Sequence, residues 1–411
     1  MNLQSIKNIY HFILSFIANI IYDFPSRKLI VVGVTGTDGK TTTSSLIYHI
    51  LNKVGKKASV ITSVSAVIGN KTYDTGFHVT TPGPLTVQKY LKQAVDDGSE
   101  YFVLETTSHA LDQYRVYGIN YAIGLLTNIT HEHLHYHKTY EKYVKAKAKL
   151  LKWSKLALIN RDDKSYEIVH KLCHGNCKTY GLEYEADYNI DIAKKNGLDL
   201  AQFNKYNYLG AYTVCHELGL SDEEIFSAMK TFKLPKGRME VIYTNGFKVI
   251  VDFAHTPNGL HEALNAIKQL YKPLKIIHVF GAAAFRDDAK RPIMGDESAS
   301  HADTTILTEE DYRTEDPNKI CREIAAGLLK NKFRQEESDS YNGNKKTFTV
   351  IIDRKKAIEK ALSIVKSNDV IVLTGKGHEQ SLCRGTKEYP WDDKKTVLEI
   401  IRKLRVMSYE F

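Results

Sequence analysis

Val32-Gly33-Val34-Thr35-Gly36-Thr37-Asp38-Gly39-Lys40-Thr41-Thr42-Thr43 is the stretch that decides the fold of this chain. A short apolar run before it, residues 29–32, predicts a buried parallel strand. Apolar residues at helical spacing follow it over residues 44–54 and stop at Gly55, which predicts a helix with a glycine after its last turn. A glycine-rich turn between a strand and a helix points several backbone N–H groups at one place, and that place suits a phosphate.

Lys40 is positioned in this turn to reach the terminal phosphates of a nucleotide, and a threonine hydroxyl after it could hold Mg²⁺. The usual phosphate-loop pattern has a glycine five residues before Gly39, where this chain has Val34. The sequence therefore predicts a shortened phosphate loop. The alternative is an ordinary turn that happens to contain a lysine. The expected nucleotide contacts are Gly36, Thr37, Asp38, Gly39, Lys40, Thr41 and Thr42.

The composition is that of an ordinary globular protein, with 411 residues of which 43% are hydrophobic and 26% charged. This length allows two or three domains with full cores. The net charge of +9 favours an anionic substrate or surface. Basic residues are not interleaved with aromatic ones in a block, so we expect no nucleic-acid partner. Five cysteines without framework spacing are typical of a reducing compartment, and we expect a cytoplasmic monomer.

Residues 1–27 are apolar but carry His11, Ser15 and Asn19 at every fourth position, on one stripe of a helix. The apolar run is too short and too interrupted to predict a membrane span, and no cleavage site follows it. It predicts an amphipathic helix. Residues 4–22 either pack on the body of the protein, which we prefer, or make peripheral contact with a membrane.

The rest of the chain alternates strands and helices twice, which predicts an α/β protein of two domains. Residues 28–236 form a central P-loop ATPase-like domain with a parallel sheet, and residues 237–411 form a C-terminal Rossmann-like domain. The break between them is Leu234-Pro235-Lys236-Gly237. Strands are predicted at 101–105, 121–127, 249–253, 275–280, 304–307, 349–352 and 370–373; helices are predicted at 140–152, 201–218 and 221–232, and from Asn258, Lys290, Asn318 and Lys355.

Three features near the predicted strands could bear chemistry. Glu105 ends a strand at the edge where ligands bind, so it could hold Mg²⁺, although it could also be a charge in solvent. Residues 128–137 contain four alternating histidines, which could form a transition-metal site or place one histidine near Mg²⁺. Lys147 is one of several lysines on a basic helix, and spacing alone predicts that it is solvated.

Several separated motifs, all in one order, resemble those of the Mur ligase family and, within it, the muramyl-tripeptide synthetases. They are residues 36–43, Thr80-Thr81-Pro82, Glu105-Thr-Thr-Ser-His-Ala-Leu to Arg115, residues 128–137, Ala146-Lys147, Phe203-Asn204 with Asn207, Gly237-Arg238-Met239-Glu240, Asp252-Phe-Ala-His255-Thr-Pro257, Lys290-Arg291-Pro292 and Gly375-Lys376-Gly377-His378-Glu379.

The resemblance implies ATP-dependent amide synthesis between a UDP-linked muramyl dipeptide and an amino acid, in peptidoglycan synthesis. A carboxylate is a poor electrophile, so ATP would convert it to an acyl phosphate that the incoming amine attacks. Charge then builds on the transferring phosphoryl group, which calls for lysine, Mg²⁺ and backbone donors. The alternatives are the same chemistry on another acid, as in folylpolyglutamate or cyanophycin synthesis, and a non-catalytic ATP-binding partner protein.

By position, the resemblance assigns Lys40 to the β/γ-phosphates, Thr41 and Glu105 to a first Mg²⁺, and His133 to a second. Lys147 matches a lysine that is carbamylated in this family and so becomes an oxygen ligand, which reverses the prediction made from spacing. The remaining assignments are Asn204, Asn207, Arg238, Asp252 and His255 to the nucleotide; Thr80, Thr81, Ser108 and Arg115 to the muramyl peptide; and Arg313, Gly375 and Glu379 to the incoming amino acid, for which meso-diaminopimelate is expected.

The chain departs from the family pattern in four respects. The stretch between Tyr184 and Phe203 is much shorter than in the family, so part of the small sheet of the central domain is missing. Residues 1–27 cannot supply the leading domain that binds the UDP moiety in this family. Residues 281–287 have alanines where the family has glycines, and alanine disfavours a positive φ. The family signature Asp-Asn-Pro-Arg is Glu310-Asp311-Tyr312-Arg313 here, although Arg313 still suits a second carboxylate on the amino acid.

Overall fold

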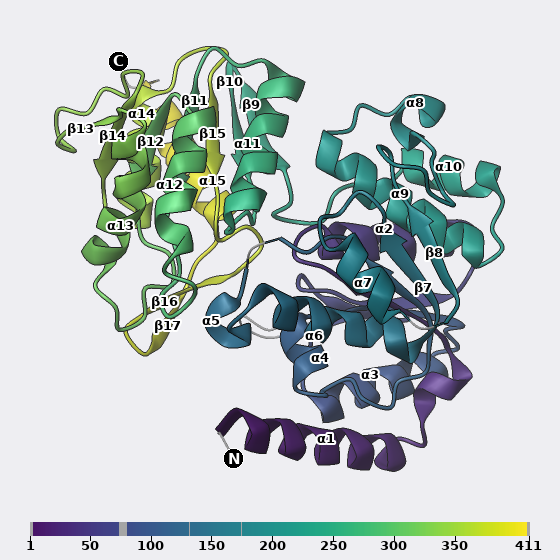
Figure 1. Ribbon diagram of the computed structural model, residues 1–411. Coiled ribbons are helices and arrows are strands. Elements are labelled where there is room, and N and C mark those ends of the chain that lie inside the picture. Colours follow the sequence, from purple (N-terminus) through teal and green to yellow (C-terminus); the bar gives the residue numbers. More distant parts are fainter. Residues whose placement is uncertain (1–2, 74–79, 131, 174, 409–411) are drawn as a thin grey trace. The chain divides into compact units, whose positions relative to one another are not determined.

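The computed structural model describes residues 3–73, 80–130, 132–173 and 175–408 (Figure 1). The chain divides into two compact units, Met1–Pro235 and Lys236–Phe411. Each is a sheet covered by helices on both faces, which confirms the predicted α/β class.

The described strands of the first unit form one sheet in the order β4-β3-β2-β5-β1-β6-β7-β8. The six strands from β2 to β8 in this order run parallel, while β3 and β4 are antiparallel additions at one edge. The bounds are β1 (Ile30–Thr35), β2 (Ala58–Ile61), β3 (Ala66–Ile68), β4 (Lys71–Tyr73), β5 (Tyr101–Glu105), β6 (Tyr121–Leu126), β7 (Ser154–Asn160) and β8 (Cys177–Tyr180). Since β1 lies between β5 and β6, its carboxyl end is at the centre of the ligand-binding edge.

Alternation along the central strands explains why both faces are covered. Val32 and Val34 face a core formed with α2, α9 and α10, whereas Val31 and Phe102 face a core formed with α3, α4 and α6. The helices are α1 (Leu3–Ile21), α2 (Lys40–Lys53), α3 (Pro84–Asp96), α4 (Ser108–Asp112), α5 (Leu134–His137), α6 (Tyr140–Trp153), α7 (Tyr166–Leu172), α8 (Ile192–Asn196), α9 (Gln202–Glu217) and α10 (Asp222–Lys230), with a 3₁₀ turn at Pro25–Lys28.

Helix α1 packs on the first unit with its polar stripe facing inward. Ser15 and Asn19 are each 1% exposed; Ser15 Oγ donates to the Tyr114 carbonyl at 2.7 Å, and Asn19 Nδ2 to the Tyr117 carbonyl at 3.0 Å. Large apolar side chains on the opposite face point to solvent: Ile6, Ile9, Tyr10, Ile13, Phe16, Ile17, Ile20 and Ile21 are 43–61% exposed. This is the reverse of an ordinary amphipathic helix on a globular core. Among the described residues, no helix is long and apolar enough to cross a membrane.

The described strands of the second unit form a sheet in the order β13-β14-β12-β11-β15-β10-β9, in which only β9 is antiparallel to its neighbour. Helices α11, α12 and α13 lie over one face, and α14 and α15 pack against the other (Figure 1). The bounds are β9 (Glu240–Asn245), β10 (Phe247–Val251), α11 (Pro257–Tyr271), β11 (Ile276–Phe280), α12 (Lys290–His301), β12 (Thr304–Leu307), α13 (Pro317–Lys330), β13 (Arg334–Gln335), β14 (Thr347–Val350), α14 (Arg354–Ile364), β15 (Val370–Leu373), the hairpin β16 (Ser381–Arg384) and β17 (Lys387–Pro390), and α15 (Asp393–Ser408).

Two local predictions differ from the structure. Helix α2 begins at Lys40 rather than at Ser44. Its first turn consists largely of buried threonines, and because threonine is polar, this turn does not show the apolar spacing from which the helix was predicted. In the 281–287 turn, the positive φ falls on Phe285 (54°), which is 62% exposed, so the alanines before it need no left-handed backbone.

Candidate functional site

The phosphate loop lies between β1 and α2, at the carboxyl end of β1. Its backbone is held by the loop after β6: Thr37 N donates to the Asn128 carbonyl at 2.8 Å, and Asp38 N to Asn128 Oδ1 at 2.9 Å. Gly39 precedes α2 with φ 80°, and a Cβ there would lie 2.1 Å from Asn207 Oδ1. A side chain at position 39 would therefore collide with α9 as well as strain the backbone.

Thr41 and Glu105 meet at the start of α2. The Thr41 hydroxyl donates to Glu105 Oε1 at 3.1 Å, and Ser63 N donates to Glu105 Oε2 at 2.9 Å. Glu105 is only 1% exposed, so the alternative of a strand-terminal charge in solvent is wrong. Parallel pairing of β5 with β1, with Val34 opposite Glu105, brings this carboxylate to the loop. Ser63 is a neighbour that sequence reasoning missed.

Lys147 is buried, with 2% exposure, so the prediction from spacing that it is solvated is wrong. Its ammonium group donates to the Gly36 carbonyl and lies 4.6 Å from the centre of the Tyr143 ring. Burial, and then the charge of Lys40, hold the pKa of Lys147 well below its ordinary value. Lys40 itself donates to the Thr37 carbonyl at 2.8 Å, so both lysines contact the loop.

Among the described residues, the side-chain rings of His133 and His137 pack against His109 and Tyr143. His133 lies 4.7 Å from His109 between ring centroids, and His137 Nε2 is 3.1 Å from Ser108 Oγ. The described histidines of this stretch are not part of a three-ligand metal cluster. His131 and the side chain of His135 lie outside the described residues.

Asn204 and Asn207 lie on α9, next to the phosphate loop. Asn207 Nδ2 donates to Asn204 Oδ1 at 3.0 Å, and the Thr43 hydroxyl donates to Asn207 Oδ1 at 3.3 Å. Both asparagines are nearly buried. Thr42 is buried on the same turn of α2.

Thr81, Ser108 and Arg115 come together beyond the end of β5. The Thr81 hydroxyl donates to the Glu105 carbonyl at 3.1 Å, and Arg115 Nη1 donates to the Thr81 carbonyl at 2.9 Å. Burial lowers the pKa of Arg115, and its buried Nε has no hydrogen-bond partner among the described residues. Thr80 precedes this group and is half-buried.

In the second unit, Arg238, Asp252 and His255 surround Phe253. Arg238 lies over the Phe253 ring at 4.4 Å, and Asp252 accepts from Met239 N and Ala254 N, both at 2.7 Å. His255 Nδ1 is 2.9 Å from the Phe253 carbonyl. Burial, followed by the nearby Lys290, lowers the pKa of His255 to about 3.

Arg313, Gly375 and Glu379 belong to a second polar group at the ends of β12 and β15. Lys376 Nζ donates to Asp311 Oδ1 at 2.9 Å and to Glu379, while Gly375 lies against Glu310. Arg313 adopts a left-handed φ of 50° and donates its N–H to the Cys383 carbonyl at 3.1 Å. Burial raises the pKa of Glu310 to about 7, and its Oε2 has no partner in the described chain. Lys376 was not among the predicted residues, although it stands inside the Gly-Lys-Gly-His-Glu motif.

The sequence matches "Mur ligase middle domain" over residues 34–214 and "Mur ligase, glutamate ligase domain" over residues 237–377. The chain belongs to the Mur ligase family, which confirms the resemblance of its motifs.

Similar proteins from several bacteria are named as ligases of the same reaction. UDP-N-acetylmuramoyl-L-alanyl-D-glutamate--2,6-diaminopimelate ligase 1 of Clostridium acetobutylicum is 37% identical, over 93% of this chain and 80% of the relative. The ligase of that name from Aquifex aeolicus is also 37% identical, over 92% and 78%. A solved structure of such a ligase is 28% identical with a TM-score of 0.59, covering 92% of this chain and 79% of the other. Mycobacterium tuberculosis folylpolyglutamate synthase, at 13% identity and a TM-score of 0.67, shares the fold.

Proposed function

We propose that this protein is a cytoplasmic, ADP-forming ligase that joins meso-diaminopimelate to UDP-MurNAc-L-Ala-D-Glu through an acyl phosphate, in peptidoglycan synthesis. The observation that carries the proposal is the convergence of Thr41, Glu105 and Lys147 on the phosphate loop. A second support is that two relatives, each 37% identical to this chain, are named as 2,6-diaminopimelate ligases. A non-catalytic ATP-binding protein has no physical need for a buried carboxylate and lysine at this place.

The donor set fits ATP and Mg²⁺. Mg²⁺ prefers oxygen ligands, which the Thr41 hydroxyl and the Glu105 carboxylate offer, and His133 would lie toward a second ion. When bound, Mg²⁺ would neutralise charge on the phosphates. Lys40 and the loop N–H groups would hold the β- and γ-phosphates, and Gly39 leaves room for them beside Asn207. Arg238, Asp252 and His255 are proposed as further ligands of the nucleotide.

Lys147 would act as a carbamate. Only a neutral amine attacks CO₂, and burial favours the neutral form of Lys147 by lowering its pKa. The nitrogen lone pair would form the N–C bond as a C=O π bond opens, and one N–H proton would leave to solvent. The resulting carbamate anion would replace a buried ammonium, which is costly, with carboxylate-like oxygens that can bind a metal next to the loop. This explains why a lysine rather than an arginine occupies the position, since arginine stays ionised.

The two substrates would be held by the two remaining groups. The unpartnered Nε of Arg115, beside Thr81 and Ser108, suits an anionic group of the muramyl peptide. Arg313, with Gly375 and Glu379, would recognise the incoming amino acid, its guanidinium binding a carboxylate and Glu379 binding an ammonium.

The proposal is tested by incubating the protein with ATP, Mg²⁺ and UDP-MurNAc-L-Ala-D-Glu and measuring phosphate release with a panel of amino acids. We expect the fastest release with meso-diaminopimelate and almost none with the Lys40→Ala variant. Release with L-lysine alone would change the amino acid assigned. In a parallel assay a folate-type acid replaces the muramyl dipeptide, and release only there would favour the other ligase chemistry. No release with any pair of acid and amino acid would overturn the proposal.

We also propose that the outward face of α1 lies on a lipid surface. The segment 3–21 has no acidic residue and contains Lys7, and Arg27 follows it, whereas the charge of Lys28 is paired with Asp23 at 2.8 Å. The helix therefore combines an apolar face with a small excess of positive charge. We expect the wild-type protein to float with anionic vesicles and the double variant Ile13→Glu/Phe16→Glu to remain in the vesicle-free fraction. Leu85 is an exposed leucine on α3, and Leu85→Glu should float like the wild type. If the protein does not float with vesicles and instead self-associates as its concentration rises, the proposal is contradicted.

A further inference from the structure

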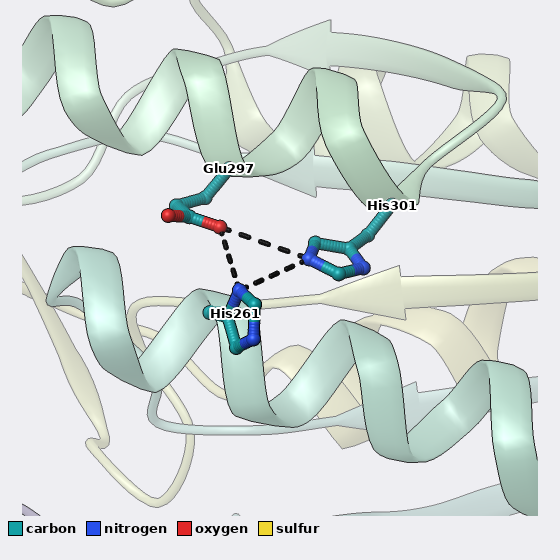
Figure 2. Close-up of side chains that lie close together, drawn as sticks. All are labelled: His261, Glu297 and His301. Carbon is teal, nitrogen blue, oxygen red and sulfur yellow. Dashed lines mark hydrogen bonds and ion pairs between the residues drawn. The ribbon is translucent and has the colours of Figure 1, made fainter.

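Three potential metal ligands converge on the outer face of the second unit, outside the groups described above. His261 lies on α11, and Glu297 and His301 lie one turn apart on α12 (Figure 2). His261 Nδ1 is 3.0 Å from Glu297 Oε2 and 3.1 Å from His301 Nε2, and the third edge, His301 Nε2 to Glu297 Oε2, is 3.7 Å. All three atoms point to one spot.

Protons alone satisfy this arrangement poorly. If His261 Nδ1 carries the proton and donates to Glu297, it cannot also accept from His301 Nε2. If His301 Nε2 carries the proton and donates to His261 Nδ1, two lone pairs face each other across the 3.0 Å contact between His261 and Glu297. A single cation accepts one lone pair from each of the three atoms, so it removes the conflict.

The geometry agrees with a small transition-metal ion. Zn²⁺ binds histidine nitrogen and carboxylate oxygen at about 2.0–2.2 Å, so neighbouring ligands of a tetrahedral site lie about 3.3 Å apart. The three edges here bracket that distance. Two imidazoles and one carboxylate are also a set that favours Zn²⁺ and its first-row neighbours over Mg²⁺.

The surroundings leave the site rigid but open. The side chains of His261, Glu297 and His301 are 46%, 27% and 14% exposed, so an ion can enter and a water can complete its coordination. Helix α12 is held firmly, because a Cβ on Gly327 of α13 would lie 2.0 Å from the Pro292 carbonyl. The exposed Lys268 on α11 is the cation whose charge opposes binding, and its long side chain can turn to solvent.

We propose that His261, Glu297 and His301 bind one divalent transition ion, with Zn²⁺ the preferred ion, and that the ion cross-links α11 to α12. This site is separate from the proposed Mg²⁺ ligands near the phosphate loop, because its residues belong to the second unit. Its ligation joins two helices on one face of the second sheet, so its first effect is on the stability of that unit.

The test is a Zn²⁺ titration of the full chain by calorimetry, in excess Mg²⁺ so that oxygen-rich sites are filled. We expect one Zn²⁺ per chain and at least tenfold weaker binding in Glu297→Gln and in His301→Ala. Co²⁺ should give visible absorption without a thiolate band, since no cysteine belongs to the cluster. Zn²⁺ should also slow hydrogen exchange in α11 and α12 of the wild type but not of the variants.

Two controls separate this site from other Zn²⁺ ligands. The variant His170→Ala removes an exposed histidine on α7 and should bind as wild type. The double variant Cys173→Ser/Cys177→Ser removes the two thiols near the start of β8 and should also keep the Zn²⁺. Circular dichroism without metal checks that each variant is folded. Unchanged Zn²⁺ affinity in the cluster variants, or Zn²⁺ lost with the cysteines, would overturn the proposal.

Discussion

At the scale of single residues, burial changes what a side chain can do, and Lys147 is the clearest case. Desolvation, and then the charge of Lys40, lower the pKa of Lys147 and so disfavour an ammonium in this position. We predict that Lys147→Ala lowers phosphate release by about 10²-fold or more, the scale of losing one electrostatic group at a phosphoryl-transfer site. A short carboxylic acid should partly restore it.

Lys145 provides the matched control for this prediction, because it is an exposed lysine on the same helix. Lys145→Ala should keep wild-type activity. Full activity in Lys147→Ala would refute the role of Lys147 as a ligand, and so would equal losses in the two variants.

Gly39 tests the loop itself. We predict that Gly39→Ala weakens ADP binding by at least tenfold in calorimetry, because its Cβ meets Asn207 at a position that also has φ 80°. Gly55 has the same φ with open space around it. Gly55→Ala should therefore cost about 1 kcal/mol of stability from backbone strain but leave ADP binding unchanged. Equal ADP affinity in both variants would contradict the steric explanation.

At the scale of elements, contacts between neighbours decide the protonation of buried groups. His278 on β11 is fully buried between Ser298 Oγ of α12 and Thr374 Oγ1 after β15, both at 2.9 Å. Burial, with the charge of Arg354, lowers its pKa to about 3. Because the unfolded chain takes up a proton near pH 6.5 and the folded one does not, stability should fall as the pH falls from about 6.5 to 3.

We predict that this one group contributes a slope of up to about 1.4 kcal/mol per pH unit in that window, and nothing further below it. Denaturant unfolding at several pH values, read by hydrogen exchange of β11, should show a shallower acid loss in His278→Gln. The exposed His170→Gln should keep the wild-type slope. The same slope in His278→Gln would mean that other groups cause the acid loss.

Helix α1 shows that a helical period alone does not say which face is buried. Its stripe of His11, Ser15 and Asn19 was visible in the sequence, but hydrogen bonds to the carbonyls of Tyr114 and Tyr117 turn this polar stripe inward. Those carbonyls belong to a turn almost a hundred residues away, so no local pattern could have indicated the orientation.

At the scale of the whole molecule, each unit has its own core, and the second unit also contains a buried ion pair. In the second unit, Arg354 makes a two-pronged ion pair with Asp393, at 2.8 and 2.7 Å, and both side chains are fully buried. Trp391 Nε1 also donates to Asp393 Oδ1. We predict that Asp393→Asn costs about 3–5 kcal/mol, because it leaves a buried guanidinium without its counter-charge.

Hydrogen exchange should locate this loss in residues 236–411 and leave the strands of residues 1–235 nearly unchanged. The double variant Arg354→Met/Asp393→Leu should recover much of the stability, since apolar side chains can replace a buried pair. A similar loss in both units, or no recovery in the double variant, would count against this explanation.

In the first sheet β1, β5 and β6 could be predicted, and in the second β10, β11, β12, β14 and β15, because these strands are continuous apolar runs. The buried strands β2 and β7 were not predicted. The predicted bounds hold for β5, β12 and β15, while β10 and β14 begin two residues earlier than expected. Strand β9 was missed, because an edge strand with half of its residues exposed lacks such a run.

The burial of Lys147 had a signal in the sequence, since it lies four residues after Tyr143 and three before Leu150, on the buried stripe of α6.

The sequence by itself determined the local shape of the phosphate loop, because the strand, the glycine turn, Lys40 and the helix are contiguous. Only the tertiary structure decided which side chains join that loop. Glu105 reaches Thr41 across 64 residues through the register of β5 on β1, and His261 meets His301 across 40 through the packing of α11 on α12. Contacts of this kind depend on how strands pair and helices pack, and a run of neighbouring residues does not encode them.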